Sequence, residues 1–293
     1  MNSVSAVITV YNKENTIREA VESIIRQTVD AKEIYIIDDG SSDGSIKIIK
    51  ELASRYKKIV PIFETHRGIV YVSNIGLEKS TGDFVVFLDA DAVIEDDWLE
   101  KIMPYFNDEK VAAVSGLIKL ANPKSVWACL SGYNLEYRHA RIKTIYVDHV
   151  STCNTAYRKS ALNKVGLFDQ EFYYGLDNDL SYRMKAAGYK LILAKDVFCR
   201  HFWPEDFRSF FRQRFNGAIG RMRLIRKYSG RWKGDDVSNI RYFLGLSLLD
   251  EMMFFIKRKK IFIGLFLPFF YLLRMITWAS GILCFIFVIR NKK

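Results

Sequence analysis

The chain has 293 residues, of which 49% are hydrophobic and 14% aromatic, and its formal net charge is +11. This length and apolar content allow a sizeable core and exclude a disordered chain. The positive charge leaves nucleic acid, an anionic membrane or a phosphorylated substrate as partners. Basic residues are densest at 208–233, 257–260 and 290–293, beside the most apolar segment, so we expect an anionic membrane surface and no nucleic acid.

The four cysteines lie far apart and form no C-x-x-C pair. This spacing predicts a reducing compartment, with neither a disulfide framework nor a zinc knuckle. The N-terminus enters a strand-like segment without the basic and apolar regions of a signal peptide. We therefore expect the N-terminal part to lie in the cytoplasm.

Strand-like and helix-like patterns alternate along the first 90 residues. A run rich in Val, Ile and Thr begins the chain, and the helix after it presents Ile17, Val21 and Ile24 on one face. The predicted strands are 3–11, 33–37, 59–63 and 84–88, and the predicted helices begin near 15, 46 and 69. Such alternation is typical of an α/β fold with a mostly parallel, doubly wound sheet and right-handed crossovers.

Two of the predicted strands end in acidic residues. Asp38 and Asp39 end the second, and Asp89 and Asp91 follow the fourth. Because parallel strands present their carboxyl ends on one rim, we expect Tyr11, Asp39 and the Asp89/Asp91 pair to line one crevice. Two carboxylates at such an edge suit Mg²⁺ or Mn²⁺ bound to phosphate oxygens, although an isolated D-x-D is also compatible with a solvated acidic turn.

Glycine-rich phosphate motifs are absent from the sequence. No G-x-G-x-x-G follows the first predicted strand, and no G-x-x-x-x-G-K-[ST] occurs anywhere. Phosphate must therefore be held through a metal rather than by a glycine cradle.

Short motifs recur in a fixed order along the first 200 residues. The first half contains Val7-Ile-Thr-Val-Tyr-Asn12, Ile36-Ile-Asp-Asp-Gly-Ser-Ser-Asp43, Asn74-x-Gly76 with Thr81-Gly-Asp83, and Phe87-Leu-Asp-Ala-Asp91. The second half contains Asn154-Thr-Ala-Tyr-Arg-Lys159, Val165-Gly-Leu-Phe-Asp169 and Asp177-Asn-Asp-Leu-Ser-Tyr-Arg183. In order and spacing they resemble the signatures of family 2 glycosyltransferases of GT-A fold, over roughly residues 4–203.

The resemblance implies a metal-dependent, inverting transfer of one sugar from a nucleoside-diphosphate sugar to a hydroxyl. The acceptor would be a glycan precursor of a cell-surface glycan, and only the basic and apolar C-terminal tail suggests that this precursor is lipid-linked. A bound Mn²⁺ or Mg²⁺ would neutralise the charge that develops on the leaving diphosphate. By the family's pattern Asp91 is the closer metal ligand, and Asp89 contacts the ribose or a metal-bound water.

Other motif positions imply the nucleotide contacts. Thr9, Tyr11 and Asp39 match positions for uridine recognition, which favours a UDP-sugar, and Arg67 is a candidate for the diphosphate. Core packing for Tyr11, a turn or cap role for Asp39 and a solvated Arg67 remain open as alternatives.

The family takes its general base from an acidic pair that opens a helix, and here Leu176 replaces the first acid. Asp177 remains and is the expected base, with helix capping as the alternative. His201 follows a short apolar segment and is a candidate third metal ligand, because neutral imidazole suits Mn²⁺. A structural histidine between aromatic residues is the alternative. His66, His139 and His149 show no comparable partner pattern.

Several positions depart from the family's pattern. Thr9 stands where Pro is common, Ser73 where Arg is common and Ala92 where a third Asp is common, which leaves the donor sugar open. Asn216 stands where processive synthases have the Arg of Q-x-x-R-W, so we expect single addition rather than polymerisation.

The C-terminal third combines basic and apolar character. We expect a catalytic domain over 1–205, a basic helical region over 206–255 and an apolar membrane-associated tail over 256–293. The segment 207–233 is predicted to be either an amphipathic helix on anionic lipid or a helix packed over the acceptor site. In 261–289, Arg274 divides two apolar arms, each too short to span a bilayer, so we expect an interfacial or re-entrant helical pair on the cytoplasmic face of the membrane. Burial in the protein core or in an oligomer interface is the alternative.

Two other functions are compatible with the acidic pair. A nucleotidyltransferase would also use two carboxylates and Mg²⁺ beside a parallel sheet. An inactive nucleotide-sugar binding or scaffold protein at the membrane is suggested only by the missing acid at Leu176. A homo-oligomer stays open as a partner.

Overall fold

The computed structural model describes residues 3–228 and 248–289, with side chains described as far as Phe287. The chain divides into two compact units, Met1–Ile118 with Thr144–His201, and Lys119–Lys143 with Phe202–Lys293. The sequence suggested boundaries after residues 205 and 255. The structure instead assigns 119–143 to the C-terminal unit, because its helix α5 (Val126–Ala140) packs against two helices from the end of the chain.

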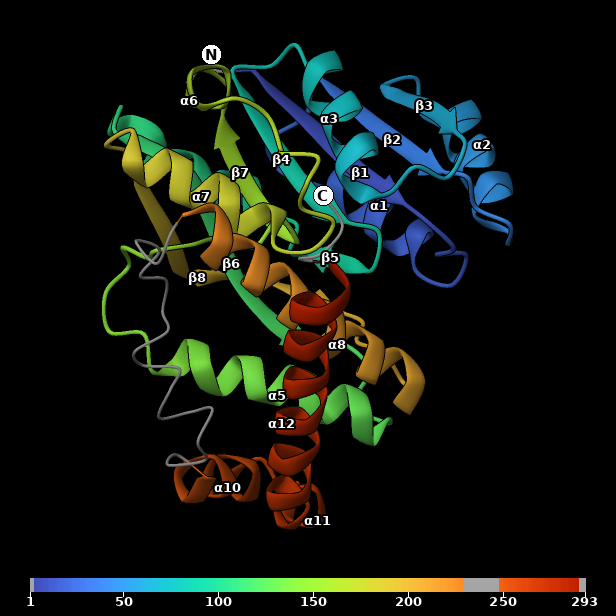
Figure 1. Cartoon of the computed structure of the whole chain (residues 1–293). Coiled ribbons are helices and arrows are strands. Elements are labelled where there is room, and N and C mark those ends of the chain that lie inside the picture. The colour runs from blue at the N-terminus through green and yellow to red at the C-terminus, as the bar shows by residue number, and fades with distance from the viewer. Residues whose placement is uncertain (1–2, 229–247, 290–293) are drawn as a thin grey trace. The chain divides into compact units, whose positions relative to one another are not determined.

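The described strands form an eight-stranded sheet in the order β3-β2-β1-β4-β7-β6-β8-β5. Its first four strands are β1 (Val4–Val10), β2 (Glu33–Asp39), β3 (Ile59–Glu64) and β4 (Phe84–Asp89). All three pairings among them are parallel, and Figure 1 shows these blue-to-teal strands side by side. The predicted α/β fold with a parallel, doubly wound sheet is therefore confirmed here.

Three helices connect these strands, namely α1 (Ile17–Ile25), α2 (Ser45–Arg55) and α3 (Ile69–Lys79). Their apolar residues recur at helical spacing, and the buried ones face the sheet. The helix α3 packs against β1 and β2, where Gly76 lies so close to Val7 that an added Cβ would meet its side chain at 2.3 Å.

The other half of the sheet is built with antiparallel pairings. It contains β5 (Ala92–Ile94), β6 (Val111–Leu120), β7 (Asn154–Arg158) and β8 (Lys190–His201). The pairings β4–β7, β6–β7 and β5–β8 are all antiparallel. The helices of this half are α4 (Trp98–Ile102), a 3₁₀ turn η1 (Met103–Asn107), α6 (Lys159–Val165) and α7 (Leu176–Ala186).

The change of direction at β7 brings distant segments to the end of β4. Asp89 ends β4 opposite Thr9 of β1, and its backbone N–H donates to the carbonyl of Cys153, just before β7, at 3.0 Å. His201 ends β8 and pairs with Ala92 of β5. Residues near 10, 90, 153 and 201 therefore meet at one rim of the sheet.

The C-terminal unit is helical among its described residues. Besides α5 it contains α8 (Phe207–Lys227), α10 (Leu248–Lys257), α11 (Ile261–Leu265), α12 (Leu267–Cys284) and a π-helical turn η2 (Phe285–Ile289). Its core contains Leu130, Phe210, Phe255, Leu267, Phe270 and Tyr271. The helix α8 packs closely on α12, because a Cβ added at Gly281 would lie 2.7 Å from the carbonyl oxygen of Phe215. Residues 229–233 of the predicted basic helix lie outside the described residues.

The expected break at Arg274 is wrong. The helix α12 runs through this residue, and the preceding helix ends earlier, at the turn before Pro268. The side chain of Arg274 is 3% exposed and lies over the ring of Tyr271, 4.4 Å from its centroid. Glu251 of α10 is completely buried in the same cluster, where it accepts hydrogen bonds from Asn134 Nδ2 at 2.7 Å and from the Tyr271 hydroxyl.

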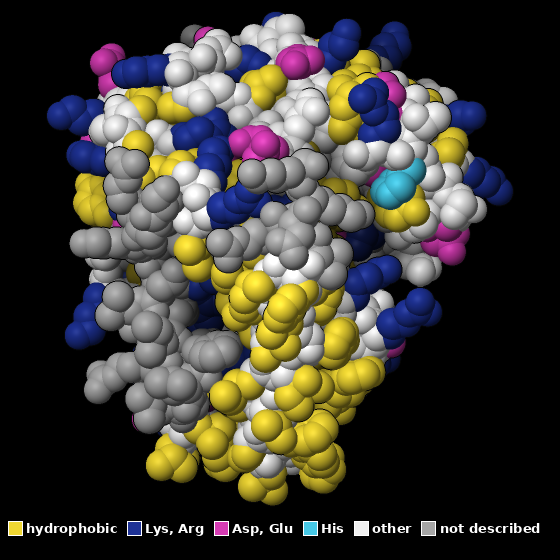
Figure 2. Space-filling model, viewed as in Figure 1, with side chains coloured by type: hydrophobic (Ala, Val, Ile, Leu, Met, Phe, Trp, Pro, Cys, Tyr) yellow, Lys and Arg dark blue, Asp and Glu magenta, His cyan; other side chains and the backbone are white. Residues whose placement is uncertain are grey.

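The opposite side of these helices exposes large apolar side chains, which we call the apolar face. It comprises Leu249, Met253, Ile256, Ile261, Phe262, Leu265, Phe266, Phe269, Leu272, Met275, Ile276 and Leu283. Figure 2 shows hydrophobic side chains gathered over α11 and α12. Within the described residues one helix, Leu267–Phe287, is long and apolar enough to cross a membrane, a test that core helices of soluble proteins also pass.

Candidate active site

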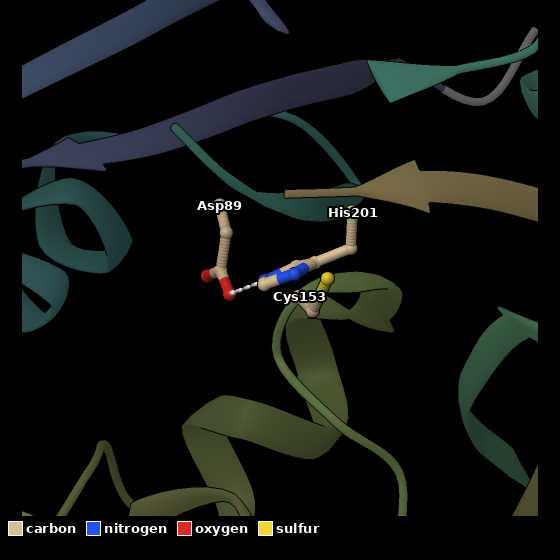
Figure 3. A group of neighbouring side chains, drawn as sticks. All are labelled: Asp89, Cys153 and His201. Atoms are coloured by element: carbon tan, nitrogen blue, oxygen red, sulfur yellow. Dashed lines mark ion pairs between the residues drawn. The ribbon is translucent and has the colours of Figure 1, made fainter. Parts of the chain in front are cut away.

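Two carboxylates and one imidazole converge at the rim of the sheet. His201 Nε2 lies 3.2 Å from Asp91 Oδ1 and 3.9 Å from Asp89 Oδ2. On its other oxygen, Asp91 Oδ2 lies 2.5 Å from the ammonium group of Lys13, which comes from the loop after β1. The predicted grouping of Asp89, Asp91 and His201 therefore matches the geometry, and Figure 3 shows His201 directed toward Asp89.

The three groups differ in their electrostatic environments. Burial and the neighbouring charge of Asp91 raise the pKa of Asp89 to about 6. Burial also acts to raise the pKa of Asp91, but the charges and hydrogen bonds of His201 and Lys13 outweigh it and lower that pKa well below its usual range. For His201, burial lowers the pKa, while Asp91 and then Asp89 outweigh burial and raise it.

This set of donors fits a divalent cation. Two carboxylates and an imidazole are the ligand types that Mn²⁺ accepts, and a cation between them would offset the repulsion that raises the pKa of Asp89. In the described structure the ammonium group of Lys13 and the imidazole of His201 both contact Asp91. The site is thus built for a positive charge between Asp89 and Asp91.

A third carboxylate, Asp177, lies in the first turn of α7 and acts electrostatically on Asp89. Its Oδ1 accepts hydrogen bonds from the backbone N–H and the side-chain amide of Asn178, at 2.8 and 3.1 Å. Burial raises its pKa, against the opposing effect of His149. A carboxylate of raised pKa is suited to accept a proton.

Asp179, two residues further on, has a structural partner instead. It is completely buried and forms an ion pair with Arg183 one helical turn later, at 2.8 Å. The guanidinium of Arg183 also donates to the carbonyls of Val165, Gly166 and Leu167. Asp179 therefore anchors α7 to the segment after α6.

The residues expected at a nucleobase form a second group around the end of β2. Asp39 accepts hydrogen bonds from the backbone N–H groups of Arg67, at 2.7 Å, and Gly68, at 3.0 Å. His66 Nδ1 lies 2.9 Å from Asp39 Oδ2, and its ring stacks on half-exposed Tyr11 with centroids 4.3 Å apart. Tyr11 is thus not a core residue, and Asp39 closes the 66–68 turn.

Two further residues, Thr9 and Arg67, were predicted to contact the nucleotide. Thr9 lies on β1 as the register partner of Asp89, between the two groups of side chains. The guanidinium of Arg67 lies over the ring of Tyr71, 3.6 Å from its centroid, so in this conformation it is held on α3. Both positions are compatible with a contact to a nucleotide-sugar donor.

Four residues of the site were missed from the sequence. Lys13 and Cys153 lie beside the carboxylates and imidazole of Asp89, Asp91 and His201, while His66 and His149 act on Asp39 and Asp177. The expectation that the two histidines lack partners is wrong. The place of Lys13 at the site could have been predicted, since it lies two residues after Tyr11. The place of Cys153 follows only from the register between β4 and β7.

Comparison with known proteins decides the family. Residues 5–166, more than half of the chain, match the family described as Glycosyl transferase family 2. The chain belongs to glycosyltransferase family 2. It is thus an enzyme of the glycosyltransferase class.

Relatives of this family 2 glycosyltransferase include a poly-beta-1,6-N-acetyl-D-glucosamine synthase of Staphylococcus epidermidis. The two are 25% identical over 294 residues, which cover 98% of this chain and 65% of the relative. The chain therefore spans somewhat less than two thirds of that synthase. A match to a Staphylococcus aureus synthase of the same name is 26% identical and covers 75% of this chain.

Solved structures confirm the GT-A fold. A mannosyltransferase from Pyrobaculum calidifontis, in complex with GDP-Man and Mn²⁺, has a TM-score of 0.62 at 20% identity, covering 98% of this chain and 76% of its own. The GalNAc-T7 structure with UDP, GalNAc and Mn²⁺ has a TM-score of 0.58 at 16% identity, covering 76% and 48% of the respective chains. Both are glycosyltransferases that bind a nucleotide and Mn²⁺.

Proposed function

We propose that this family 2 glycosyltransferase transfers a single sugar, with inversion, from a nucleoside-diphosphate sugar to a hydroxyl of a glycan or lipid-linked acceptor. The observation that carries the proposal is the convergence of Asp89, Asp91 and His201 on one rim with Asp177 as a nearby buried carboxylate. This arrangement separates a cation-binding group from a proton acceptor, and the transfer needs both.

The residues at the rim have distinct tasks in this proposal. Asp91, Asp89 and His201 would hold Mn²⁺ or Mg²⁺, which supplies charge neutralisation for the leaving diphosphate. Asp177 accepts the proton of the acceptor hydroxyl as that oxygen attacks the anomeric carbon. Because Asp177 is a single base and no second carboxylate nucleophile is assigned, attack occurs once, opposite the leaving group, and inverts the anomeric configuration.

The group at the end of β2 supports binding of a nucleobase. Tyr11 presents a half-exposed ring for stacking, and the neighbouring Asp39 carboxylate fixes the backbone of the adjoining 66–68 turn. By the resemblance of Thr9, Tyr11 and Asp39 to uridine-binding positions, we favour a UDP-sugar. The two solved structures bind GDP-Man and UDP, so a direct comparison of UDP- and GDP-sugars with Mn²⁺ by thermal stabilisation tests the preference.

Single addition is proposed although the curated relatives are named as synthases of a polymer. It rests on Asn216 at the position where the processive motif has Arg. Product length decides it: one added sugar per acceptor supports the proposal, and a ladder of products contradicts it.

We place the enzyme at the cytoplasmic face of a membrane through its C-terminal unit. The apolar face lies beside the basic run Lys257–Lys260, a combination that suits an anionic lipid surface. Residues of this face would then contact lipid, and a lipid-linked acceptor would be presented on the same surface.

Asp177→Asn tests the base. We expect turnover to fall by about two or more orders of magnitude, since the variant cannot accept the proton, while Mn²⁺-dependent donor binding and melting temperature stay near wild type. Asp179→Asn is the matched comparison, because it removes the buried ion pair with Arg183 and is expected to lower stability instead. Transfer by Asp177→Asn at the wild-type rate would remove the assignment.

A further inference from the structure

A thiol lies inside the metal-binding group. One ligand atom each from Asp89, Cys153 and His201 lies within 4.8 Å of the others, and Figure 3 shows the three side chains pointing toward one another from three separate segments. Cys153 is only 3% exposed, so its sulfur faces this group and not solvent. The proposed transfer gives this sulfur no task.

The backbone fixes this position. The Asp89 N–H donates to the Cys153 carbonyl, which makes the two residues neighbours across the β4–β7 pairing. On β8, Cys199 and His201 are two residues apart and share one face of the strand. Cys153 Sγ lies 3.9 Å from Cys199 Sγ, so it is in contact with the same face from which His201 extends.

The sulfur changes which cations the group prefers. Carboxylates alone favour hard ions, whereas a thiolate with an imidazole and carboxylates favours zinc and similar borderline ions. In tetrahedral zinc sites the donor atoms are about 3.3–3.8 Å apart, given bond lengths near 2.0–2.3 Å. The separations of 3.2 and 3.9 Å between His201 Nε2 and the two carboxylates are already close to this spacing.

We propose that Cys153 is a metal ligand used only by zinc-class cations. Such a cation would be held by four donors, Cys153, His201, Asp89 and Asp91, and would thereby exclude the diphosphate of the donor sugar. On coordination the thiol releases its proton to solvent and the sulfur bonds to the metal as thiolate. Four protein donors fill a tetrahedral ion and leave no open position, whereas an octahedral Mn²⁺ bound without the sulfur keeps positions for phosphate oxygens. This inference rests on the metal site of the proposed function.

Cobalt(II) provides a direct probe, because thiolate coordination gives it a sulfur-to-metal charge-transfer band in the near ultraviolet. Under reducing conditions we expect this band in the full-length wild-type protein and its loss in Cys153→Ser and Cys153→Ala. The matched control is Cys199→Ser, which changes the adjacent buried thiol outside the three-ligand group and is expected to keep the band.

Affinity gives an independent readout. Cys153→Ser is expected to weaken Zn²⁺ binding at least about tenfold, because losing even a residue that only orients a metal ligand costs about this much affinity. The Mn²⁺ affinity of this variant should stay within about threefold of the wild-type value. The nucleotide-sugar donor and Mn²⁺ together should raise the melting temperature of the wild-type protein, and added Zn²⁺ should abolish this increase. In Cys153→Ser, a Zn²⁺ concentration about ten times higher should be needed for the same effect.

The two proposals fail separately. Absence of the cobalt band in wild type, or its persistence in both Cys153 variants, overturns the thiolate ligand even where Mn²⁺ binds normally. If the wild-type protein did not bind Mn²⁺, the metal site of the proposed function would be contradicted instead. Mn²⁺ affinity in Asp91→Asn, measured by electron paramagnetic resonance, reports on that site alone and is expected to fall sharply.

Discussion

Asp89 and Asp91 show how two residues of one type acquire different roles. Asp91 contacts Lys13 with one oxygen and His201 with the other, and these two groups hold its pKa well below the usual range, so it is ionised throughout the physiological pH range. Asp89 shares only the more distant contact with His201, and burial beside Asp91 raises its pKa. Under the proposed function, Asp91 would offer a cation an ionised carboxylate, and Asp89 would be the carboxylate whose charge the cation stabilises.

The turn that holds Asp39 depends on one glycine. Gly40 has φ +72°, and a Cβ there would meet the backbone N of His66 at 2.7 Å. We expect Gly40→Ala to cost about 1–2 kcal/mol from the positive φ alone, and to displace the 66–68 turn that donates to Asp39. Nucleotide affinity should therefore fall about tenfold or more, measured by donor titration with Mn²⁺.

Gly188 supplies the control for this substitution. It has φ +86°, but an added Cβ would meet nothing within 4 Å. Gly188→Ala is expected to lose a similar amount of stability, seen as a lower melting temperature, without a change in nucleotide affinity. Equal affinity losses in the two variants would show that general destabilisation, and not the turn at Asp39, determines binding.

At the scale of elements, local patterns sufficed for the parallel half of the sheet. The apolar run 84–88 became β4, which is buried along its length, and the helix expected to begin near residue 69 became α3, whose buried residues recur at helical spacing. The antiparallel half depends on register between distant strands, which no local pattern contains. Asp89, Asp91 and His201 were predictable from motifs, whereas the closeness of Cys153 follows only from the pairing of β4 with β7.

Arg274 is a second case in which a distant partner overrides a local rule. A charge in the middle of an apolar run suggested a break or a costly exposure to lipid. The partner is Glu251, buried in α10, whose pKa is raised by burial and held down in part by Tyr271, Asn134 and the charge of Arg274. Because α10 lies more than 15 residues before Arg274 in the sequence, periodicity cannot reveal this pairing.

Glu251→Ala tests whether this cluster holds the C-terminal helices together. Removing the carboxylate leaves the Asn134 amide and the Tyr271 hydroxyl without their buried acceptor and takes away the negative charge that interacts with buried Arg274, so we expect a loss of about 3–5 kcal/mol in unfolding free energy. The neighbouring Asp250→Ala removes an exposed ion pair with Arg141 and should cost no more than about 1 kcal/mol. Urea denaturation followed by tryptophan fluorescence compares the two, and similar costs would contradict a structural role for the cluster.

At the scale of the whole molecule, the two units differ in what their surfaces expose. The first unit carries isolated apolar side chains such as Val60 and Phe63, which are ordinary on a soluble surface. The second presents the continuous apolar face together with the basic run Lys257–Lys260. A truncation before α10 is a poor test of membrane binding, because it would also remove the core partners of Leu130 and Phe210.

Point substitutions on the apolar face test membrane association while they preserve that core. Phe262, Leu265 and Phe269 are 69%, 61% and 58% exposed, so a triple change to Ser removes apolar contact area without opening a cavity. At about 1.5–3 kcal/mol for a fully buried large apolar side chain, partial insertion of three of them contributes about 3 kcal/mol or more. We expect the triple variant to bind anionic vesicles about a hundredfold more weakly in sedimentation assays, and the matched Val60→Ser/Phe63→Ser variant to bind like wild type. Raising the salt concentration should weaken wild-type binding further, since the Lys257–Lys260 charges are screened. Equal sedimentation of all three proteins would assign the apolar face to contacts other than lipid.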